Sequence, residues 1–136
     1  MKRTIAVSLG ALSLTAAGLV GFAPTAGAQT AAPAGVQAGA MHLYQNDNYG
    51  GGTYSWTSSD SSFANNYWNH ESSAGSVNDG ASSMKNTTSQ VVRLYQTSGG
   101  SCSGDRYTAD PKSSDKDLSS NSSNPDFDNK ASCVKF

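Results

Sequence analysis

The sequence contains 136 residues, of which 36% are hydrophobic, and its formal net charge is −1. This length fits a single domain with a small apolar core. Lysine and arginine are not clustered, so the composition argues against a nucleic acid or an anionic membrane surface as the partner.

The first 28 residues have the parts of a secretory signal peptide. A basic start precedes an apolar run, residues 5–22, and Ala26-Gly27-Ala28 has the pattern of a cleavage site. A membrane anchor is the alternative, but the glycines in the run and the small-residue exit favour cleavage. We therefore expect a secreted protein with a mature chain of 136 − 28 = 108 residues, carrying 9 − 2 = 7 basic and 10 acidic side chains. Residues 29–40 would form a flexible leader.

A hairpin is predicted to follow the leader. Residues 41–45 and 53–57 alternate between apolar and polar side chains, which is typical of half-buried strands. We expect Leu43, Tyr54 and Trp56 to anchor the hairpin in the core, although Trp56 on a sheet face could instead stack on a ligand.

Residues 58–76 form a polar excursion that contains the aromatic side chains of Phe63, Tyr67 and Trp68. Phe63 and Tyr67 are four residues apart, so one helical turn would bring both onto the core. His70 has no metal-binding residues at a suitable spacing, and we expect it to be a solvated loop residue.

The remainder of the chain indicates further short strands between polar turns. We expect an oxygen-rich motif and a strand in 77–86, strands in 89–96 and 105–109 around a glycine turn, a polar loop in 111–126, and a second motif with a closing strand in 127–136.

Two landmarks repeat at nearly the same interval. Leu43-Tyr44-Gln45 returns 51 residues later as Leu94-Tyr95-Gln96. Asn78-Asp79-Gly80-Ala81-Ser82-Ser83 returns 50 residues later as Asp128-Asn129-Lys130-Ala131-Ser132-Cys133. Such a period indicates an internal duplication. We therefore expect an all-β domain over residues 41–136, a β-sandwich of two Greek-key motifs at about 41–88 and 89–136.

Both copies of the motif are rich in oxygen atoms. Calcium takes carboxylate, amide and backbone carbonyl oxygens at about 2.3–2.6 Å. The plainer interpretation is that Asn-Asp-Gly and Asp-Asn form turns, with serine filling the loops. Two copies in register favour calcium over that interpretation.

The two cysteines, Cys102 and Cys133, both lie in the part expected to be exported. An even count in an exported chain favours a disulfide, which would close a loop of about thirty residues and contribute roughly 3–4 kcal/mol. Two buried free thiols are the alternative. A zinc site would need suitably spaced partners that the sequence lacks.

These features resemble the secreted microbial βγ-crystallin domains over about residues 41–136. Tyr44, Tyr49 and Gly51 match that family's hairpin signature of an aromatic residue, four residues, an aromatic residue, one residue and glycine. Residues 78–83 match its calcium motif, Asn/Asp-Asn/Asp-x-x-Ser/Thr-Ser, at every constrained position. The resemblance implies two Greek keys in a sandwich, with two calcium sites that are each built from both halves.

The implied ligands are side-chain oxygens and backbone carbonyls. One site would use Asp79, the carbonyl of Gly80 and the hydroxyl of Ser132. The other would use Asn129, the carbonyl of Lys130 and the hydroxyl of Ser82. Backbone carbonyls near Gln45 and Gln96 would complete the two sites, and Asn78 and Asp128 would orient the loops.

The second half departs from the family pattern at its cysteines. In an alignment without gaps, Gly100 replaces the second aromatic residue and Cys102 replaces the glycine of the hairpin signature. Cys133 replaces the last serine of the motif, a position that is not usually a ligand. A disulfide between Cys102 and Cys133 would explain these departures.

The sequence therefore predicts a secreted, monomeric calcium-binding protein whose fold calcium stabilises. We expect weaker binding at the Asn129 site, because its side chain is neutral. One alternative is a secreted peptidase inhibitor that uses an exposed loop such as 98–105, and another is a small toxin or cell-surface binding module. We do not expect an enzyme, because His42 and His70 lie in no catalytic context.

Overall fold

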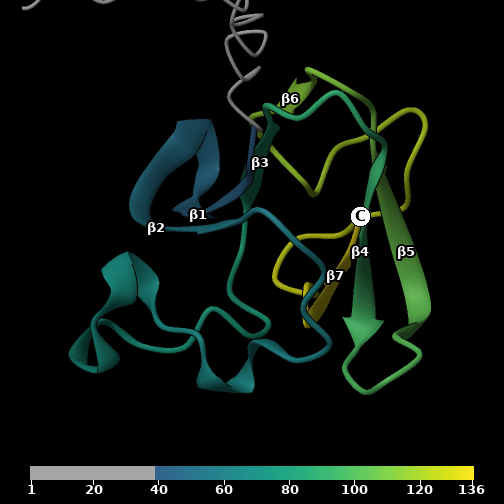
Figure 1. Cartoon of the computed structure of the whole chain (residues 1–136). Helices are drawn as coiled ribbons and strands as arrows, with labels where there is room; N and C mark the ends of the chain where they lie inside the picture. The colour runs from purple at the N-terminus through teal and green to yellow at the C-terminus, as the bar shows by residue number, and fades with distance from the viewer. Residues whose placement is uncertain (1–38) are drawn as a thin grey trace, which may run out of the picture. The chain divides into compact units, whose positions relative to one another are not determined.

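The computed structural model describes residues 39–136, which form two antiparallel β-sheets (Figure 1). The predicted signal peptide and most of the predicted leader lie outside the described residues. Between residues 39 and 136 the helices are short 3₁₀ turns, and none has the length and apolar character needed to cross a membrane.

The first sheet is built around the predicted hairpin. Its strands have the order β2-β1-β3-β6. Their bounds are Met41–Asn46 (β1), Gly50–Trp56 (β2), Ser83–Asn86 (β3) and Ser114–Asp115 (β6). Leu43 pairs with Tyr54 on one side and with Met84 on the other, and the alternation of β1 places Met41 and Leu43 in the core.

The second sheet repeats this plan with the order β5-β4-β7. Its strands are Val92–Thr97 (β4), Ser103–Ala109 (β5) and Cys133–Lys135 (β7). Leu94 pairs with Tyr107 and with Val134, in the same way that Leu43 pairs with its neighbours in the first sheet. The duplicated landmark thus forms the central strand of each sheet.

Each half also contributes a short segment to the sheet of the other half. Strand β6 comes from the second half and pairs with β3 of the first sheet, while Asp60 of the first half forms an isolated bridge with Val134 of β7. Each Greek key therefore takes its last paired segment from the other half, and β6 lies in a stretch expected to be a loop. A two-residue strand and a single bridge are too short to show a period-2 pattern.

The polar excursion carries three 3₁₀ turns, Phe63–Asn65 (η2), Trp68–His70 (η3) and Ser72–Ala74 (η4); a fourth, η1, forms the first hairpin turn at Asp47–Tyr49. Phe63 and Trp68 are buried, whereas Tyr67 is only partly buried. The predicted helical turn linking Phe63 and Tyr67 is therefore wrong. The 3₁₀ turn η2 ends at Asn65, and the backbone is extended at Asn66, so Phe63 and Tyr67 are not on one face of a helix.

One continuous core joins the sheets with the loops around them. Its largest fully buried side chains are Trp68, Phe63, Phe127, Met41, Leu43, Met84, Leu94 and Leu118. The connection between the halves is held by Asn86, whose side chain is almost fully buried. Its amide donates to the carbonyls of Gln90, Ala109 and Asp110, and its oxygen accepts from Thr88.

Candidate metal centre

The two motif loops lie against each other and exchange backbone hydrogen bonds. The Asp79 amide donates to the Ala131 carbonyl over 3.0 Å, and the Asn129 amide donates to the Ala81 carbonyl over 2.9 Å. Asp79 and Asn129 both have left-handed backbones, with φ values of 53° and 52°. The loops are therefore related by an approximate twofold exchange, which brings the motif of each half to the other.

Asp79 and Ser132 come from different halves and are in contact. The Ser132 hydroxyl donates to Oδ1 of Asp79 over 2.7 Å. Ser132 lies just before β7, and only 4% of its surface is exposed. The two oxygens that the resemblance assigns to one site thus lie side by side, 53 residues apart in the chain.

The second predicted pair lies close through its backbone. The hydrogen bond from the Asn129 amide to Ala81 brings Asn129 next to the residue that precedes Ser82. Within the described residues, no hydrogen bond joins the side chains of Asn129 and Ser82. The two candidate sites are therefore related in position but differ in their side-chain contacts.

Each motif pairs a carboxylate with an amide, but in opposite order. The side-chain amide of Asn78 donates to Oδ2 of Asp79 over 2.7 Å, and the side-chain amide of Asn129 donates to Oδ2 of Asp128 over 2.8 Å. In the first motif the carboxylate occupies the predicted ligand position, whereas in the second it lies one residue earlier. Asn78 and Asp128 both contact the predicted ligand, in keeping with a supporting role.

The hairpins approach the same loops. The Ser82 amide donates to the Tyr44 carbonyl over 3.0 Å, and the Ser132 amide donates to the Tyr95 carbonyl over 2.9 Å. Gln45 and Gln96, the residues that follow those tyrosines, therefore lie next to the two predicted serine ligands. The side chain of Gln45 accepts a hydrogen bond from the Gly52 amide.

Gly80 and Lys130 follow the two predicted ligand side chains. Lys130 directs its ammonium group to Asp126, with a 3.8 Å ion pair and a 2.7 Å hydrogen bond to the Asp126 carbonyl. The Lys130 charge is therefore engaged by a carboxylate, so a cation beside the Lys130 carbonyl would meet less repulsion.

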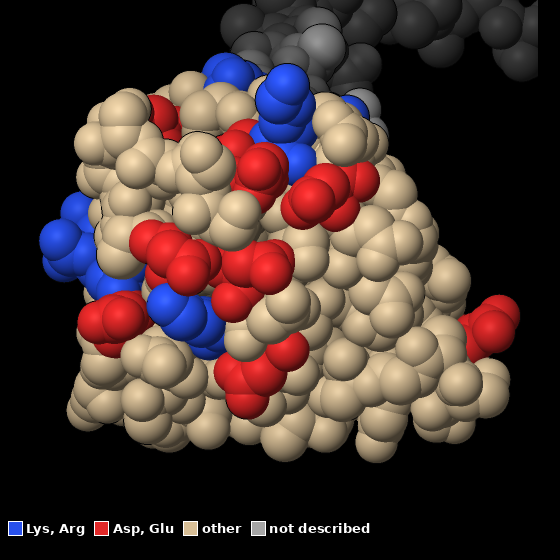
Figure 2. Space-filling view, turned by 180° about the vertical axis from the view of Figure 1, so that it is seen from behind, with Lys and Arg blue, Asp and Glu red and all other residues tan. Residues whose placement is uncertain are grey.

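The donor set fits a hard cation. Every predicted ligand atom is an oxygen, the type of donor that a hard cation prefers. Within residues 39–136, no three His, Cys, Asp or Glu side chains lie together as a metal-binding group, so the predicted ligands are mostly amide, hydroxyl and backbone oxygens. In the second motif, Oδ1 of Asp128 is buried without a hydrogen-bond partner. A buried unpaired carboxylate oxygen is costly, and a nearby positive charge would compensate it. All 10 acidic and 7 of the 9 basic residues lie in the described part, and Figure 2 shows carboxylates on one face interspersed with lysine and arginine side chains.

Sequence reasoning missed the role of Trp68. Its indole covers Gly52 and Gly80, and a Cβ on Gly80 would lie 3.5 Å from the Trp68 ring. Trp68 therefore supplies an aromatic contact beside the first motif, together with buried Val77 immediately before it. The cluster of aromatic residues in 58–76 was the signal, but its packing partner depends on the tertiary fold.

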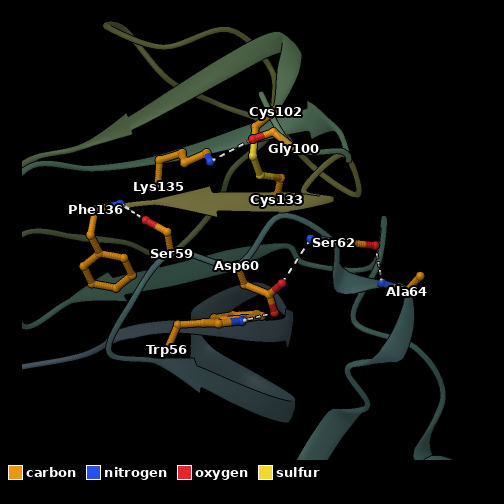
Figure 3. The surroundings of a disulfide bond; sticks show 10 residues. All are labelled: Trp56, Ser59, Asp60, Ser62, Ala64, Gly100, Cys102, Cys133, Lys135 and Phe136. Carbon is orange, nitrogen blue, oxygen red and sulfur yellow. Dashed lines mark hydrogen bonds between the residues drawn. A yellow bond between two sulfur atoms is a disulfide. The ribbon is translucent and has the colours of Figure 1, made fainter.

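The predicted disulfide between Cys102 and Cys133 is present (Figure 3). It joins the β4–β5 turn to the last position of the second motif. In the first half the equivalent position is Ser83, whose hydroxyl donates to the Asn46 carbonyl over 2.6 Å and accepts from the Tyr49 amide over 3.0 Å. Each hairpin is thus tied to its own motif, by hydrogen bonds in one half and by a covalent bond in the other.

The alignment that placed Cys102 at the conserved glycine of the hairpin was wrong. Asn46 pairs with Gly50 across a three-residue turn, whereas Thr97 pairs with Ser103 across residues 98–102. The second turn is therefore two residues longer, and Gly104, with φ of 80°, takes the place of Gly51, with φ of 72°.

The arrangement of two Greek keys around exchanged loops defines a β-sandwich of the βγ-crystallin class. Three βγ-crystallin domains are among the solved structures that share it. A structure on the evolution of the eye lens βγ-crystallin domain fold has 18% identity and a TM-score of 0.57, covering 72% of this chain and 84% of that one. A βγ-crystallin from Ciona intestinalis has 24% identity and a TM-score of 0.52, covering 71% of this chain and 98% of that one. A βγ-crystallin from an archaeon has 23% identity and a TM-score of 0.53, covering 72% of this chain and 96% of that one.

The sequence itself identifies the family. The profile of peptidase inhibitor family I36 matches residues 29–109, more than half of the chain. The chain belongs to peptidase inhibitor family I36. No curated protein sequence matches it significantly. The family is named for inhibitors and the shared fold for lens proteins, and both are non-catalytic kinds of protein.

Proposed function

We propose that this protein is an exported βγ-crystallin-like domain that binds two calcium ions between its motif loops and is stabilised by them. The contact between the Asp79 carboxylate and the Ser132 hydroxyl carries the proposal, because two oxygen atoms from opposite halves lie 2.7 Å apart at the expected positions. The signal-like first 28 residues support export.

Each proposed site takes its ligands from both halves of the chain. Asp79, the Gly80 carbonyl and Ser132 would hold one ion, while Asn129, the Lys130 carbonyl and Ser82 would hold the other. Bound calcium would supply positive charge that attracts both loops at once. Because those loops belong to different halves, separating the halves would require losing the ion, so calcium would oppose unfolding.

The melting temperature of the protein tests this proposal. At a calcium concentration one hundred times the dissociation constant, a single site adds about 2.7 kcal/mol of stability. We expect millimolar calcium to raise the melting temperature and a chelator to reverse the rise. Combining Asp79→Ala with Ser82→Ala removes one ligand from each site and should abolish the response.

The matched control combines Asp105→Ala with Ser101→Ala, which makes the same chemical changes at exposed positions outside both motifs. This variant should respond to calcium like the unmodified protein. An identical calcium response in both double variants, or no response in the unmodified protein, would contradict the proposal.

A second candidate function is inhibition of a peptidase, which the family match supports. The candidate inhibitory segment is residues 98–105, whose first four residues are exposed and whose Cys102 is buried and bonded to Cys133. A rigid, exposed segment loses little entropy when it enters an active-site cleft. Assays against a panel of metallopeptidases and serine peptidases would test this function, with nanomolar inhibition of at least one as the expected result.

A further inference from the structure

The Asp79–Ser132 site and the disulfide meet at the start of β7. Ser132 contacts Asp79 through its hydroxyl, and the next residue, Cys133, is bonded to Cys102. The backbone of Ser132 is fixed on both sides, because its amide donates to Tyr95 and its carbonyl accepts from Phe63 over 3.0 Å. Ser132 therefore has little freedom to move independently of Cys133.

The same disulfide holds the exposed turn between β4 and β5. Residues 98–101 are exposed, the Gly99 amide donates to the Ser61 carbonyl over 2.8 Å, and the Lys135 ammonium donates to the Gly100 carbonyl over 3.3 Å. Figure 3 shows Lys135 reaching Gly100 beside the Cys102–Cys133 bond. The turn is thus attached to β7 at two points, and β7 begins at the candidate metal site.

Both cysteines are buried, with 7% of Cys102 and 0% of Cys133 exposed. A thiolate must reach one of the sulfur atoms to reduce the bond, so reduction requires local opening of this region. An opening that displaces Cys133 also displaces Ser132 and separates its hydroxyl from Asp79.

We propose that a cation at the Asp79–Ser132 site controls the opening of the Cys102–Cys133 disulfide and of the turn 98–101, whereas the related Asn129–Ser82 site does not. The distinction follows from the structure, because the residue after Ser82 is Ser83, which is tied to the other hairpin by hydrogen bonds alone. The inference rests on the proposed calcium binding and adds a regulatory link to the candidate inhibitory turn.

The expected magnitude follows from ligand linkage. If the opening requires release of the ion, calcium lowers the open population by a factor of one plus the ratio of its concentration to the dissociation constant. At one hundred times the dissociation constant of this site, reduction should therefore slow by roughly 100-fold.

The experiment measures the rate of disulfide reduction with dithiothreitol, with and without calcium. Each dithiothreitol supplies two electrons and two protons, so that the protein disulfide becomes two thiols and the reagent becomes a cyclic disulfide. Thiol alkylation followed by mass spectrometry reports the reduced fraction. The ratio of the two rates within each variant cancels any change that the substitution makes to the calcium-free rate.

Ser132→Ala and Ser82→Ala are a matched pair, because they make the same change at equivalent motif positions. Ser82→Ala should retain the slowing by calcium, and Ser132→Ala should lose most of it. Asp79→Ala removes the other partner of the same site without altering a neighbour of Cys133, and should also lose the effect.

Calorimetric titration of each variant separates the inference from the function on which it rests. If the unmodified protein binds no calcium, the proposed function fails. If calcium binds but slows reduction equally in Ser132→Ala and Ser82→Ala, or slows it in neither, the coupling is wrong while calcium binding stands.

Discussion

Ser83 and Cys133 occupy the same position in the two halves of the sandwich, but they hold their hairpins by different means. Ser83 uses two hydrogen bonds to the turn after β1, and Cys133 uses a covalent bond to the turn after β4. The second turn is longer and lacks the aromatic residue that Tyr49 provides in the first. The disulfide therefore stabilises the hairpin whose turn has no such aromatic residue.

Replacing both cysteines should cost more than replacing the serine. The loop-entropy model gives about 3–4 kcal/mol for a disulfide with a sequence separation of 31 residues. Loss of the Ser83 hydroxyl in Ser83→Ala should cost about 1–3 kcal/mol, since it removes two partly buried hydrogen bonds, to the Asn46 carbonyl and from the Tyr49 amide. Denaturant unfolding of Cys102→Ser/Cys133→Ser and of Ser83→Ala measures both values, and a larger loss in Ser83→Ala would contradict the comparison.

Gly104 is predicted to be the glycine that the second hairpin requires. Its φ of 80° is unfavourable for other residues, and a Cβ would lie 2.9 Å from the Thr97 hydroxyl oxygen. Gly104→Ala should lower the free energy of unfolding by about 1–2 kcal/mol. Gly100→Ala in the same turn is the control, because a Cβ there meets no atom within 4 Å. Equal stability of the two variants would argue against the revised alignment.

The duplicated landmarks were sufficient to predict the sandwich, because a repeated strand and a repeated loop require equivalent surroundings in the two halves. They did not predict the exchange of β6 and Asp60, since segments this short carry no periodic signal. The ungapped alignment of the two halves also placed the equivalent of Gly51 at position 102, two residues before Gly104. The length of the second turn is set by the pairing of β4 with β5, which the sequence does not show.

Asn86 is predicted to be the most important polar side chain of the core. It joins the end of β3 to the connection between the halves and to the end of β5 through three carbonyl acceptors. Asn86→Ala leaves these carbonyls without a donor and should cost about 2–4 kcal/mol. Gln90→Ala is the control, because Gln90 is exposed and takes part through its backbone carbonyl. Urea unfolding of both variants measures the difference, and a loss no larger for Asn86→Ala would refute it.

Asp60 should contribute stability that depends on pH. Partial burial alone would raise its pKa, but hydrogen bonds from Asn66, the Ser62 amide and Trp56 outweigh this effect and lower the pKa (Figure 3 shows those from Ser62 and Trp56). A lowered pKa in the folded state means that the contribution is present above the unfolded pKa of about 4 and is lost as the pH falls through the folded value.

Comparing Asp60→Asn with the unmodified protein from pH 7 to about pH 2.5 tests this sign. The variant should be less stable at neutral pH, and the difference should shrink in acid as Asp60 of the unmodified protein becomes protonated. A difference in unfolding free energy that is independent of pH would contradict the assignment.

The residues of the candidate site could be predicted, because each motif has a recognisable order of Asn, Asp and Ser residues. The resemblance to βγ-crystallin domains implied that the two loops would meet, and in the structure Asp79 lies against Ser132. The sequence shows that carboxylate and amide are reversed between the motifs, but not that each amide donates to its neighbouring carboxylate, nor that one oxygen of Asp128 is buried without a partner. These features depend on side-chain orientation, which a local sequence pattern does not specify.

Calorimetric titration of calcium into the chelator-treated protein tests the central claim most directly. We expect two binding events of modest affinity, with dissociation constants of about 10⁻⁴–10⁻³ M, the stronger one lost in Asp79→Ala and the weaker one lost in Asn129→Ala. Absence of calcium-specific heat at millimolar concentrations, or an unchanged titration in both variants, would show that the facing loops do not bind calcium.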